Sequence, residues 1–223
     1  MYSGMVAAHA YSRLSTARKH ESFVILGPNH TGYGTGLSTM TGGAWATPLG
    51  NARINTCLAE DIVSKSGLVD VEPEAHRFEH SIEVQLPFLQ YLYDDSFSFV
   101  PVCMMLQDLK TCRELGDAMV EAVKGRDIVL IASSDWTHYE PQPTAVKKDK
   151  NAIDAVLKMD EAEFQKRIME LRVSACGYGP VTTVTYAAKK LGASKAELLA
   201  YRTSGDVTGE TDAVVGYAAI AFY

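Results

Sequence analysis

The stretch Ser22-Phe-Val-Ile-Leu-Gly-Pro-Asn-His30 carries the strongest indication of the fold. Its apolar run from Ser22 to Leu26 has the length of a strand, and an uninterrupted run of this kind is typical of a strand buried on both faces. The run stops at Gly27 and Pro28, and polar residues follow at once. We therefore predict a central strand of a helix-covered sheet, with polar side chains at its carboxyl end.

A second buried strand is predicted at residues 127–132, and it leads directly into the polar stretch Ser133-Ser-Asp-Trp-Thr-His138. Further strands are predicted at residues 97–102, 197–201 and 213–222, and helices at 4–18, 54–65, 81–93, 108–124, 146–158, 161–172 and 181–191. Strands that alternate with helices indicate an α/β fold. We expect a single domain over residues 1–223, with a mostly parallel or mixed central sheet and helices on both faces.

Prolines and glycines refine this prediction. Pro87 should kink the helix at 81–93, and Pro101 favours an edge or bulge position for the strand at 97–102. The glycine-rich segment from Asn29 to Trp45 is too long for a tight turn, and we expect a functional or mobile loop. Because the sequence has neither a GxxxxGK[ST] motif nor a GxGxxG motif that opens a helix, nucleotide binding is disfavoured.

The composition is that of an ordinary globular protein, with 47% hydrophobic and 22% charged residues. A net charge of −6 argues against a nucleic-acid partner, which would require clustered Lys and Arg. No apolar stretch approaches the roughly 20 residues that span a bilayer, so no membrane association is expected. Without a CxxC pair or a secretory leader, the cysteines indicate reduced thiols in the cytoplasm. Three of them, Cys57, Cys103 and Cys112, are expected to pack in the interior.

Residues that can bind metals follow both of the strongest strands. In open α/β sheets, ligands bind beyond the carboxyl ends of the strands, where neighbouring loops diverge. His30 follows the first strand, and Asp135 and His138 follow the second with a spacing that allows them to meet at one ion. For a single residue, a capping Asp or a surface His is the favoured interpretation, but two such strand ends in one chain favour a site.

Two other segments contribute candidate residues. Ser81 is expected to cap the helix at 81–93, which places Glu83 in its first turn and His80 just before it. His80 is then either a surface residue or a group that faces the pocket. Cys176 precedes a Gly-Tyr-Gly-Pro loop, and it is either a buried, inert thiol or a thiolate ligand.

Several motifs together resemble those of the Memo-like family, and the resemblance covers the whole chain. They are YSGMVAAHAY at 2–11, GPNH at 27–30, EHSIEVQLPFLQ at 79–90, SSDWTH at 133–138, CGYGP at 176–180 and the ending VGYAAIAF. The resemblance implies the LigB-like fold of class III extradiol dioxygenase subunits. It also implies a link to the AmmeMemoRadiSam system and thus to a radical SAM protein.

The resemblance implies a pocket built from particular residues of this chain. His30, Asp135 and Cys176 match metal ligands, and His138 matches an adjacent ligand or general acid/base, so His30 and His138 are the catalytic candidates. Ligand-binding or orienting roles fall to His80, Glu83 and Asn29. One departure concerns the start of the sequence, because the family's N-terminal strand and its PHAGY-like motif, which supplies a further ligand, have no match. We expect a late start.

These residues support two functions of different classes. The first is a metal-binding protein that holds iron (Fe²⁺) or copper, with oxygenase-like or other redox activity. A Cys ligand departs from the dioxygenase pattern and disfavours cleavage of an aromatic ring. The second is a non-catalytic module that recognises a phosphorylated or anionic ligand, a small molecule or a peptide, in the same pocket. A metal hydrolase is disfavoured because the sequence has no HExxH motif. The metal, the substrate and the oligomeric state stay open.

Overall fold

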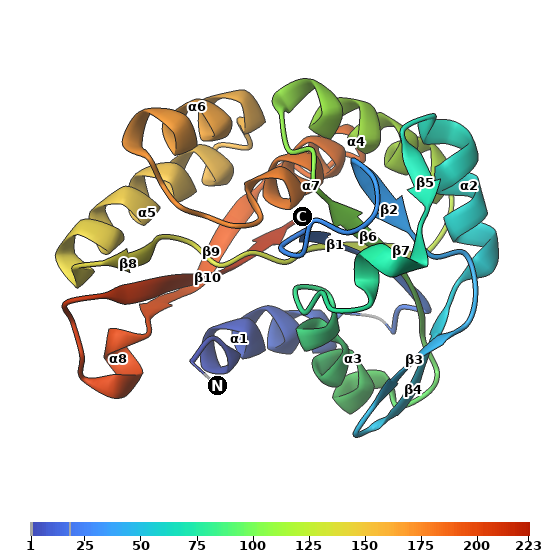
Figure 1. Ribbon diagram of the computed structural model, residues 1–223, viewed down its shortest axis with the longest axis horizontal. Coiled ribbons are helices and arrows are strands. Elements are labelled where there is room, and N and C mark those ends of the chain that lie inside the picture. Colours follow the sequence, from blue (N-terminus) through green and yellow to red (C-terminus); the bar gives the residue numbers. More distant parts are fainter. Residues whose placement is uncertain (1, 18) are drawn as a thin grey trace.

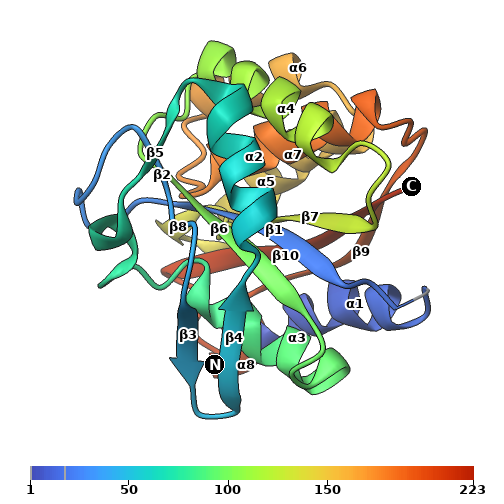
Figure 2. The same ribbon diagram turned by 90° about the vertical axis from the view of Figure 1, so that its right-hand side faces the viewer.

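The computed structural model describes residues 2–17 and 19–223, which form an α/β domain with two β-sheets (Figures 1 and 2). The strands are β1 (Ser22–Pro28), β2 (Leu37–Thr39), β3 (Ala44–Thr47), β4 (Gly50–Ile54), β5 (Val69–Val71), β6 (Ser98–Met104), β7 (Ile128–Ala132), β8 (His138–Glu140), β9 (Ala196–Thr203) and β10 (Val214–Phe222). The helices are α1 (Gly4–Ser15), α2 (Thr56–Ser66), α3 (Leu86–Tyr93), α4 (Leu109–Val123), α5 (Gln142–Leu157), α6 (Glu161–Leu171), α7 (Tyr178–Lys190) and α8 (Gly205–Thr208), with 3-10 turns η1 (Pro73–His76) and η2 (Glu83–Gln85).

The main sheet has the order β3-β4-β6-β1-β7, and β2 pairs with both β6 and β5. β1 runs parallel to β6 and β7, whereas β2 is antiparallel to β6 and β3 is antiparallel to β4. The predicted mostly parallel or mixed sheet is therefore confirmed. The second sheet, β8-β10-β9, is antiparallel.

Every residue of β1 is buried, as the apolar run predicts. Alternate side chains of β1 enter different cores, because successive residues of a strand point to opposite faces of the sheet. Val24 and Leu26 pack with residues of α2, α4 and α7, whereas Phe23 and Ile25 pack with residues of α1 and α3. The prediction of helices on both faces of the sheet is confirmed.

The expectation that the strand containing Pro101 lies at an edge is wrong. β6 pairs with β1 along its whole length, so it is an interior strand. On its other side it pairs with β4 only at Ser98 and Phe99 and with β2 only from Val102 onwards. Pro101 lies in the interval between these two partners, where no ladder bond requires its missing N–H.

The predicted strong burial of β7 is also wrong, although the strand itself is present. All five of its residues are partly exposed. Within the described residues, β7 pairs with β1 and ends the main sheet, so no strand covers its outer edge. The exposure of a strand depends on its neighbours, which an apolar run does not specify.

The helix predicted at 81–93 begins later than expected. Residues 83–85 form the turn η2, and α3 starts at Leu86, so Pro87 lies in the first turn, where a missing N–H is harmless, and does not kink a longer helix. Ser81 does not cap this helix, because its hydroxyl donates to the carbonyl of Pro28 over 3.0 Å. The glycine-rich segment predicted as one long loop contains β2 and the start of the β3–β4 hairpin.

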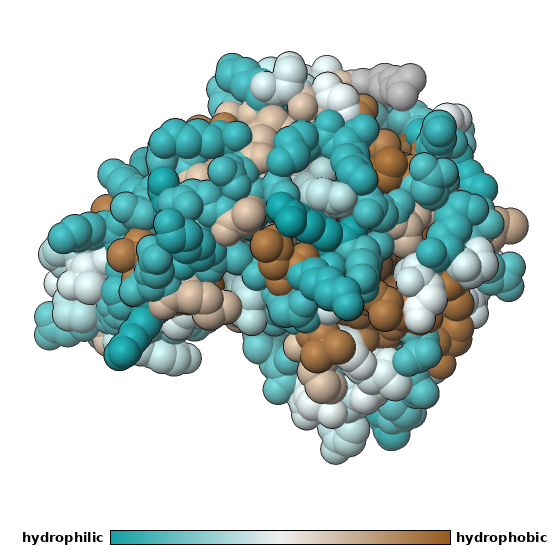
Figure 3. Space-filling view, turned by 90° about the horizontal axis from the view of Figure 1, so that it is seen from above, coloured by the Kyte–Doolittle hydropathy of each residue, from teal (hydrophilic) through white to brown (hydrophobic). Residues whose placement is uncertain are grey.

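Within the described part of the chain, no helix combines the length and the apolar character that crossing a bilayer requires. The face seen from above is largely hydrophilic, and its apolar side chains gather mainly toward the right-hand side (Figure 3).

Candidate functional site

The loop after β1 is shaped by Asn29 and presents His30. The side-chain oxygen of Asn29 accepts hydrogen bonds from the backbone N–H groups of Thr31 and Gly32, and its amide donates to the carbonyl of Tyr33. This arrangement is typical of an Asx turn, in which a short polar side chain replaces a backbone partner. Asn29, expected to bind ligand or orient other groups, thus organises the turn that carries His30.

A buried carboxylate, that of Glu79, holds His30 in place. Its Oε1 lies 2.9 Å from Nδ1 of His30, and its Oε2 accepts the backbone N–H of His30 over 2.5 Å. Oε1 also accepts the backbone N–H groups of His80 and Ser81, each over 2.9 Å. Because Nδ1 of His30 faces Glu79, the other ring nitrogen, Nε2, faces away from it.

The pKa values of this pair move in opposite directions. Hydrogen bonds to Cys176 and Glu79 raise the pKa of His30 to about 10, although burial opposes the shift. Burial acts to raise the pKa of Glu79, but the hydrogen bonds from His30 and Ser81 outweigh it and lower that pKa to about 2. Each shift favours the charged form, so His30 and Glu79 form an ion pair.

The thiol of Cys176 connects the two strand ends. The ring of His30 hydrogen-bonds to Cys176, and the backbone N–H of Asp135 donates to the same sulfur over 3.2 Å. Gly177 makes this approach possible, because a Cβ there would overlap the carbonyl oxygen of Ser133. The carbonyl of Cys176 accepts a hydrogen bond from Gln107 over 3.1 Å, which fixes the loop from the other side.

Asp135 and His138 lie next to each other, with 3.8 Å between the carboxylate and Nε2 of the imidazole. Nδ1 of His138 lies 2.8 Å from the carbonyl of Ser174, so Nδ1 donates and Nε2 is left toward Asp135. Burial raises the pKa of Asp135, and the nearby His138, His80 and His30 oppose the shift. The structure therefore brings the loops that carry Asp135, His138, His30 and Cys176 next to one another.

His80 stacks on His30, with ring centroids 4.9 Å apart and planes inclined by 19°. One ligand atom from each of His30, Glu79 and His80 lies within 4.8 Å of the others, so these three residues form a candidate metal-binding group. However, the oxygens of Glu79 already accept four N–H donors. Glu79 is thus better suited to orienting His30 than to binding an ion itself.

The carboxylate that contacts His30 is not Glu83, which was singled out from the sequence, but Glu79. Glu83 is exposed in η2, whereas Glu79, which was not singled out, is only 2% exposed and contacts His30. The sequence does contain a signal, because Glu79 and His80 are adjacent and precede a turn. Among the other cysteines, Cys103 and Cys112 are buried as predicted, but Cys57 is exposed.

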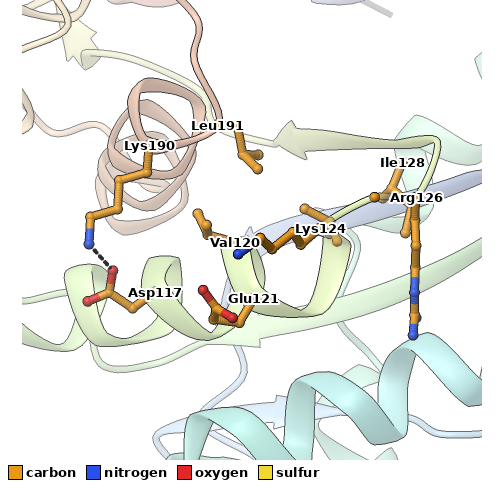
Figure 4. A pocket seen from close by; sticks show the side chains of 10 residues that line it. Asp117, Val120, Glu121, Lys124, Arg126, Ile128, Lys190 and Leu191 are labelled. Atoms are coloured by element: carbon orange, nitrogen blue, oxygen red, sulfur yellow. Dashed lines mark hydrogen bonds and ion pairs between the residues drawn. The ribbon is translucent and has the colours of Figure 1, made fainter.

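A surface cavity of about 860 Å³ lies away from this cluster, beside the C-terminal ends of α4 and α7 and the first residue of β7 (Figure 4). Its charged groups are largely paired with each other or with neighbours. Lys190 lies 2.6 Å from Asp117, and Arg126 pairs with Asp61. Since β7 leads toward Asp135 at its other end, this cavity is not part of the His, Asp and Cys cluster.

The fold and the cluster define a class of α/β protein with imidazole, carboxylate and thiol groups beyond the carboxyl ends of parallel strands. The family profile described as "Memo-like protein" matches residues 1–221, so the chain belongs to the Memo-like family and the expected resemblance is confirmed. The chain is 52% identical to a MEMO1 family protein of Methanopyrus kandleri, covering 99% of this chain and 79% of the relative. It is 48% identical to one from Methanothermobacter thermautotrophicus, covering 98% and 79%.

Among solved structures, the fold is similar to that of an uncharacterized protein from Escherichia coli K12. The TM-score is 0.61 with 16% sequence identity, and the match covers 94% of this chain and 91% of the other. At this identity the likeness supports the fold alone.

Proposed function

We propose that this protein binds a transition-metal ion through His30, Asp135 and Cys176, with His138 as an adjacent ligand or as a general acid/base. The observation that carries the proposal is the position of the Cys176 sulfur. It interacts with the ring of His30 and accepts the backbone N–H of Asp135, and this supports a site built from three segments that are distant in the sequence.

The donor set fits such an ion. Metal-binding imidazoles usually donate their other ring N–H to a carboxylate or carbonyl, which fixes the ring. His30 meets this condition through Glu79, and His138 meets it through the carbonyl of Ser174. Mixed nitrogen, oxygen and sulfur donors suit iron or copper, whereas Mg²⁺ and Ca²⁺ prefer oxygen alone.

A bound iron or copper ion would supply Lewis-acid or redox chemistry, and the proposed activity is accordingly redox or oxygenase-like. The residues of the chain would handle protons. Nε2 of His138, 3.8 Å from the carboxylate of Asp135, is placed to accept a proton from a bound molecule and return it. His30 is the second catalytic candidate, and Glu79 keeps its ring in one orientation.

The test is an anaerobic titration of the purified protein with Fe²⁺ and, separately, with Cu⁺, followed by measurement of bound metal. We expect one ion per chain, with binding weakened at least about 10-fold in Cys176→Ser and His30→Ala. Cys57→Ser is the matched control, because that thiol is exposed on α2, and it should bind like the parent protein. Equal binding by Cys176→Ser and the parent would overturn the proposal. Catechol-dependent O₂ uptake then tests for oxygenase activity.

A second candidate function is recognition of a phosphorylated or anionic ligand without catalysis. The observation that favours it is the imidazole of His30, which is 36% exposed and stacks on His80, and whose pKa is raised to about 10 by hydrogen bonds to Cys176 and Glu79. Titration with a phosphotyrosine peptide tests it, using a His30→Ala, His138→Ala double variant for comparison. Unchanged affinity in that variant would remove the cluster from this role.

The cellular setting is part of the proposal. Cys57, Cys103, Cys112 and Cys176 are all free thiols, which suits a reducing cytoplasm. From the family resemblance we also expect a functional link to a radical SAM protein, which co-purification with such a partner would test.

A further inference from the structure

The segment that carries Asp135 and His138 is held by a buried carboxylate outside the cluster. Thr137 lies between these two residues and is fully buried. Oδ1 of Asp149, on α5, accepts the backbone N–H of Thr137 over 3.0 Å and its hydroxyl over 2.5 Å. The other oxygen, Oδ2, accepts the hydroxyl of Tyr201 on β9 over 2.7 Å.

The second sheet also holds the same segment through β10. The backbone N–H of Gly216 donates to the carbonyl of Thr137, and the backbone N–H of Trp136 donates to the carbonyl of Gly216, each over 2.9 Å. Gly216 is required for this packing, because a Cβ there would overlap the carboxylate of Asp149. The N–H, hydroxyl and carbonyl of Thr137 are thus all held, which leaves the segment little freedom to rotate.

The environment of Asp149 differs from that of the other well-buried carboxylate outside the cluster, Glu161. Glu161 forms ion pairs with Arg113 and Lys189, each at 2.7 Å, and these join α4, α6 and α7. Asp149 is also fully buried, but within the described residues it forms no ion pair and is surrounded by neutral donors. Burying a carboxylate without a cation is costly, so its hydrogen bonds to Thr137 must offset a large desolvation penalty.

We infer that Asp149 is a positioning residue that directs Asp135 and His138 at one point by fixing Thr137 between them. This inference rests on the proposed metal-binding function. Asp135 and His138 are three positions apart, so a small rotation at Thr137 would turn their side chains apart.

The test compares Asp149→Ala, Asp149→Asn and Glu161→Ala in titrations with Co²⁺, following the absorption bands of the bound ion. Asp149→Ala should weaken Co²⁺ binding on the order of 10-fold to 100-fold and change the spectrum. Asn can accept both Thr137 bonds through Oδ1 and donate to the Tyr201 oxygen through Nδ2, so Asp149→Asn should bind within about 3-fold of the parent protein. Glu161→Ala should lose stability but keep its Co²⁺ affinity.

Parent-like affinity and spectrum in Asp149→Ala would overturn the inference. So would equal losses in Asp149→Asn and Asp149→Ala, because charge rather than geometry would then be responsible. If Asp149→Ala does not fold, Thr137→Val replaces it, since this change removes the hydroxyl donor and keeps the backbone N–H.

Hydrogen exchange separates a failure of this inference from a failure of the proposed function. If the parent protein binds no Co²⁺, the metal proposal fails, but Asp149→Ala should still speed amide exchange at residues 136–138 more than Glu161→Ala does. Equal exchange in the two variants would contradict the positioning role whether or not a metal binds.

Discussion

The sulfur of Cys176 accepts the backbone N–H of Asp135 over 3.2 Å, although the two residues are 41 positions apart. This bond joins the loop before α7 to the loop after β7. The ring of His30 interacts with the same sulfur. The sulfur, a proposed metal ligand, therefore also stabilises the arrangement of the loops in the metal-free protein.

Replacement of this thiol should have a measurable cost even without metal. In Cys176→Ala the N–H of Asp135 and the ring of His30 lose their acceptor, so we expect a loss of about 1–2 kcal/mol in the free energy of unfolding. Urea unfolding at pH 7 measures it. Cys57→Ala, at an exposed thiol, should change the free energy by less than about 0.5 kcal/mol. Equal effects of the two changes would mean that the sulfur bonds contribute nothing to stability.

Glu79 should make stability depend on pH in acid. The pKa of Glu79 is lowered from 4.5 to about 2, although burial alone would raise it, because hydrogen bonds from His30 and Ser81 favour the ionised form. Its contribution is therefore fully present above pH 4.5 and is lost as the pH falls toward 2. Denaturant unfolding between pH 2 and 7 should show this slope, and Glu79→Gln should flatten it.

Glu83→Gln provides the matched comparison, because Glu83 is an exposed glutamate four residues further along. It should leave both the stability at pH 7 and the acid slope unchanged. A slope that survives in Glu79→Gln but disappears in Glu83→Gln would reverse the assignment of the two carboxylates.

The comparison of Glu79 with Glu83 also shows which part of the site could be predicted from the sequence. His30 and Asp135 could be placed, because an apolar run and the polar residues after it are local features, and strand ends collect at one edge of a sheet. The choice between Glu79 and Glu83 depended on where the helix predicted at 81–93 begins. Ser81 looked like its cap, but its hydroxyl bonds to Pro28, 53 residues away, and no local pattern reports such a contact.

The same limit applies to the fold. The strand at β1 was predicted correctly with its burial, and β7, which has a similar composition, was predicted as a strand but with the wrong burial. Composition indicates that a segment is a strand, whereas its neighbours determine how much of it is exposed. The edge position predicted for Pro101 was wrong for a related reason. A proline is tolerated in this interior strand because it lies in the interval between two partner strands.

His30 should keep its proton well above neutral pH in the metal-free protein. Hydrogen bonds to Cys176 and then to Glu79 raise its pKa to about 10. Its contribution to stability is therefore present below pH 6.5 and lost as the pH rises through 10. An NMR titration of the imidazole should place its midpoint far above 6.5, and Cys176→Ala should lower that midpoint. A midpoint near 6.5 in the parent protein would contradict this environment.

Gly177 should tolerate no side chain, because its position sets the distance between the Cys176 loop and the Asp135 loop. A Cβ at this position would overlap the carbonyl oxygen of Ser133 and approach the Cβ of Ser134 to 2.7 Å. Gly177→Ala must therefore push the two loops apart, and we expect it to lower the free energy of unfolding by about 1–3 kcal/mol. Urea unfolding measures this loss.

The matched control for Gly177→Ala is Gly42→Ala, since the nearest atom to a Cβ at position 42 lies 3.9 Å away. That change should leave stability within about 0.5 kcal/mol of the parent protein. Co²⁺ titration of both variants adds a second measurement, because displacement of the Cys176 loop should weaken binding only in Gly177→Ala. If Gly177→Ala proved as stable as Gly42→Ala and bound Co²⁺ equally well, close approach of the two loops would not be what assembles the cluster.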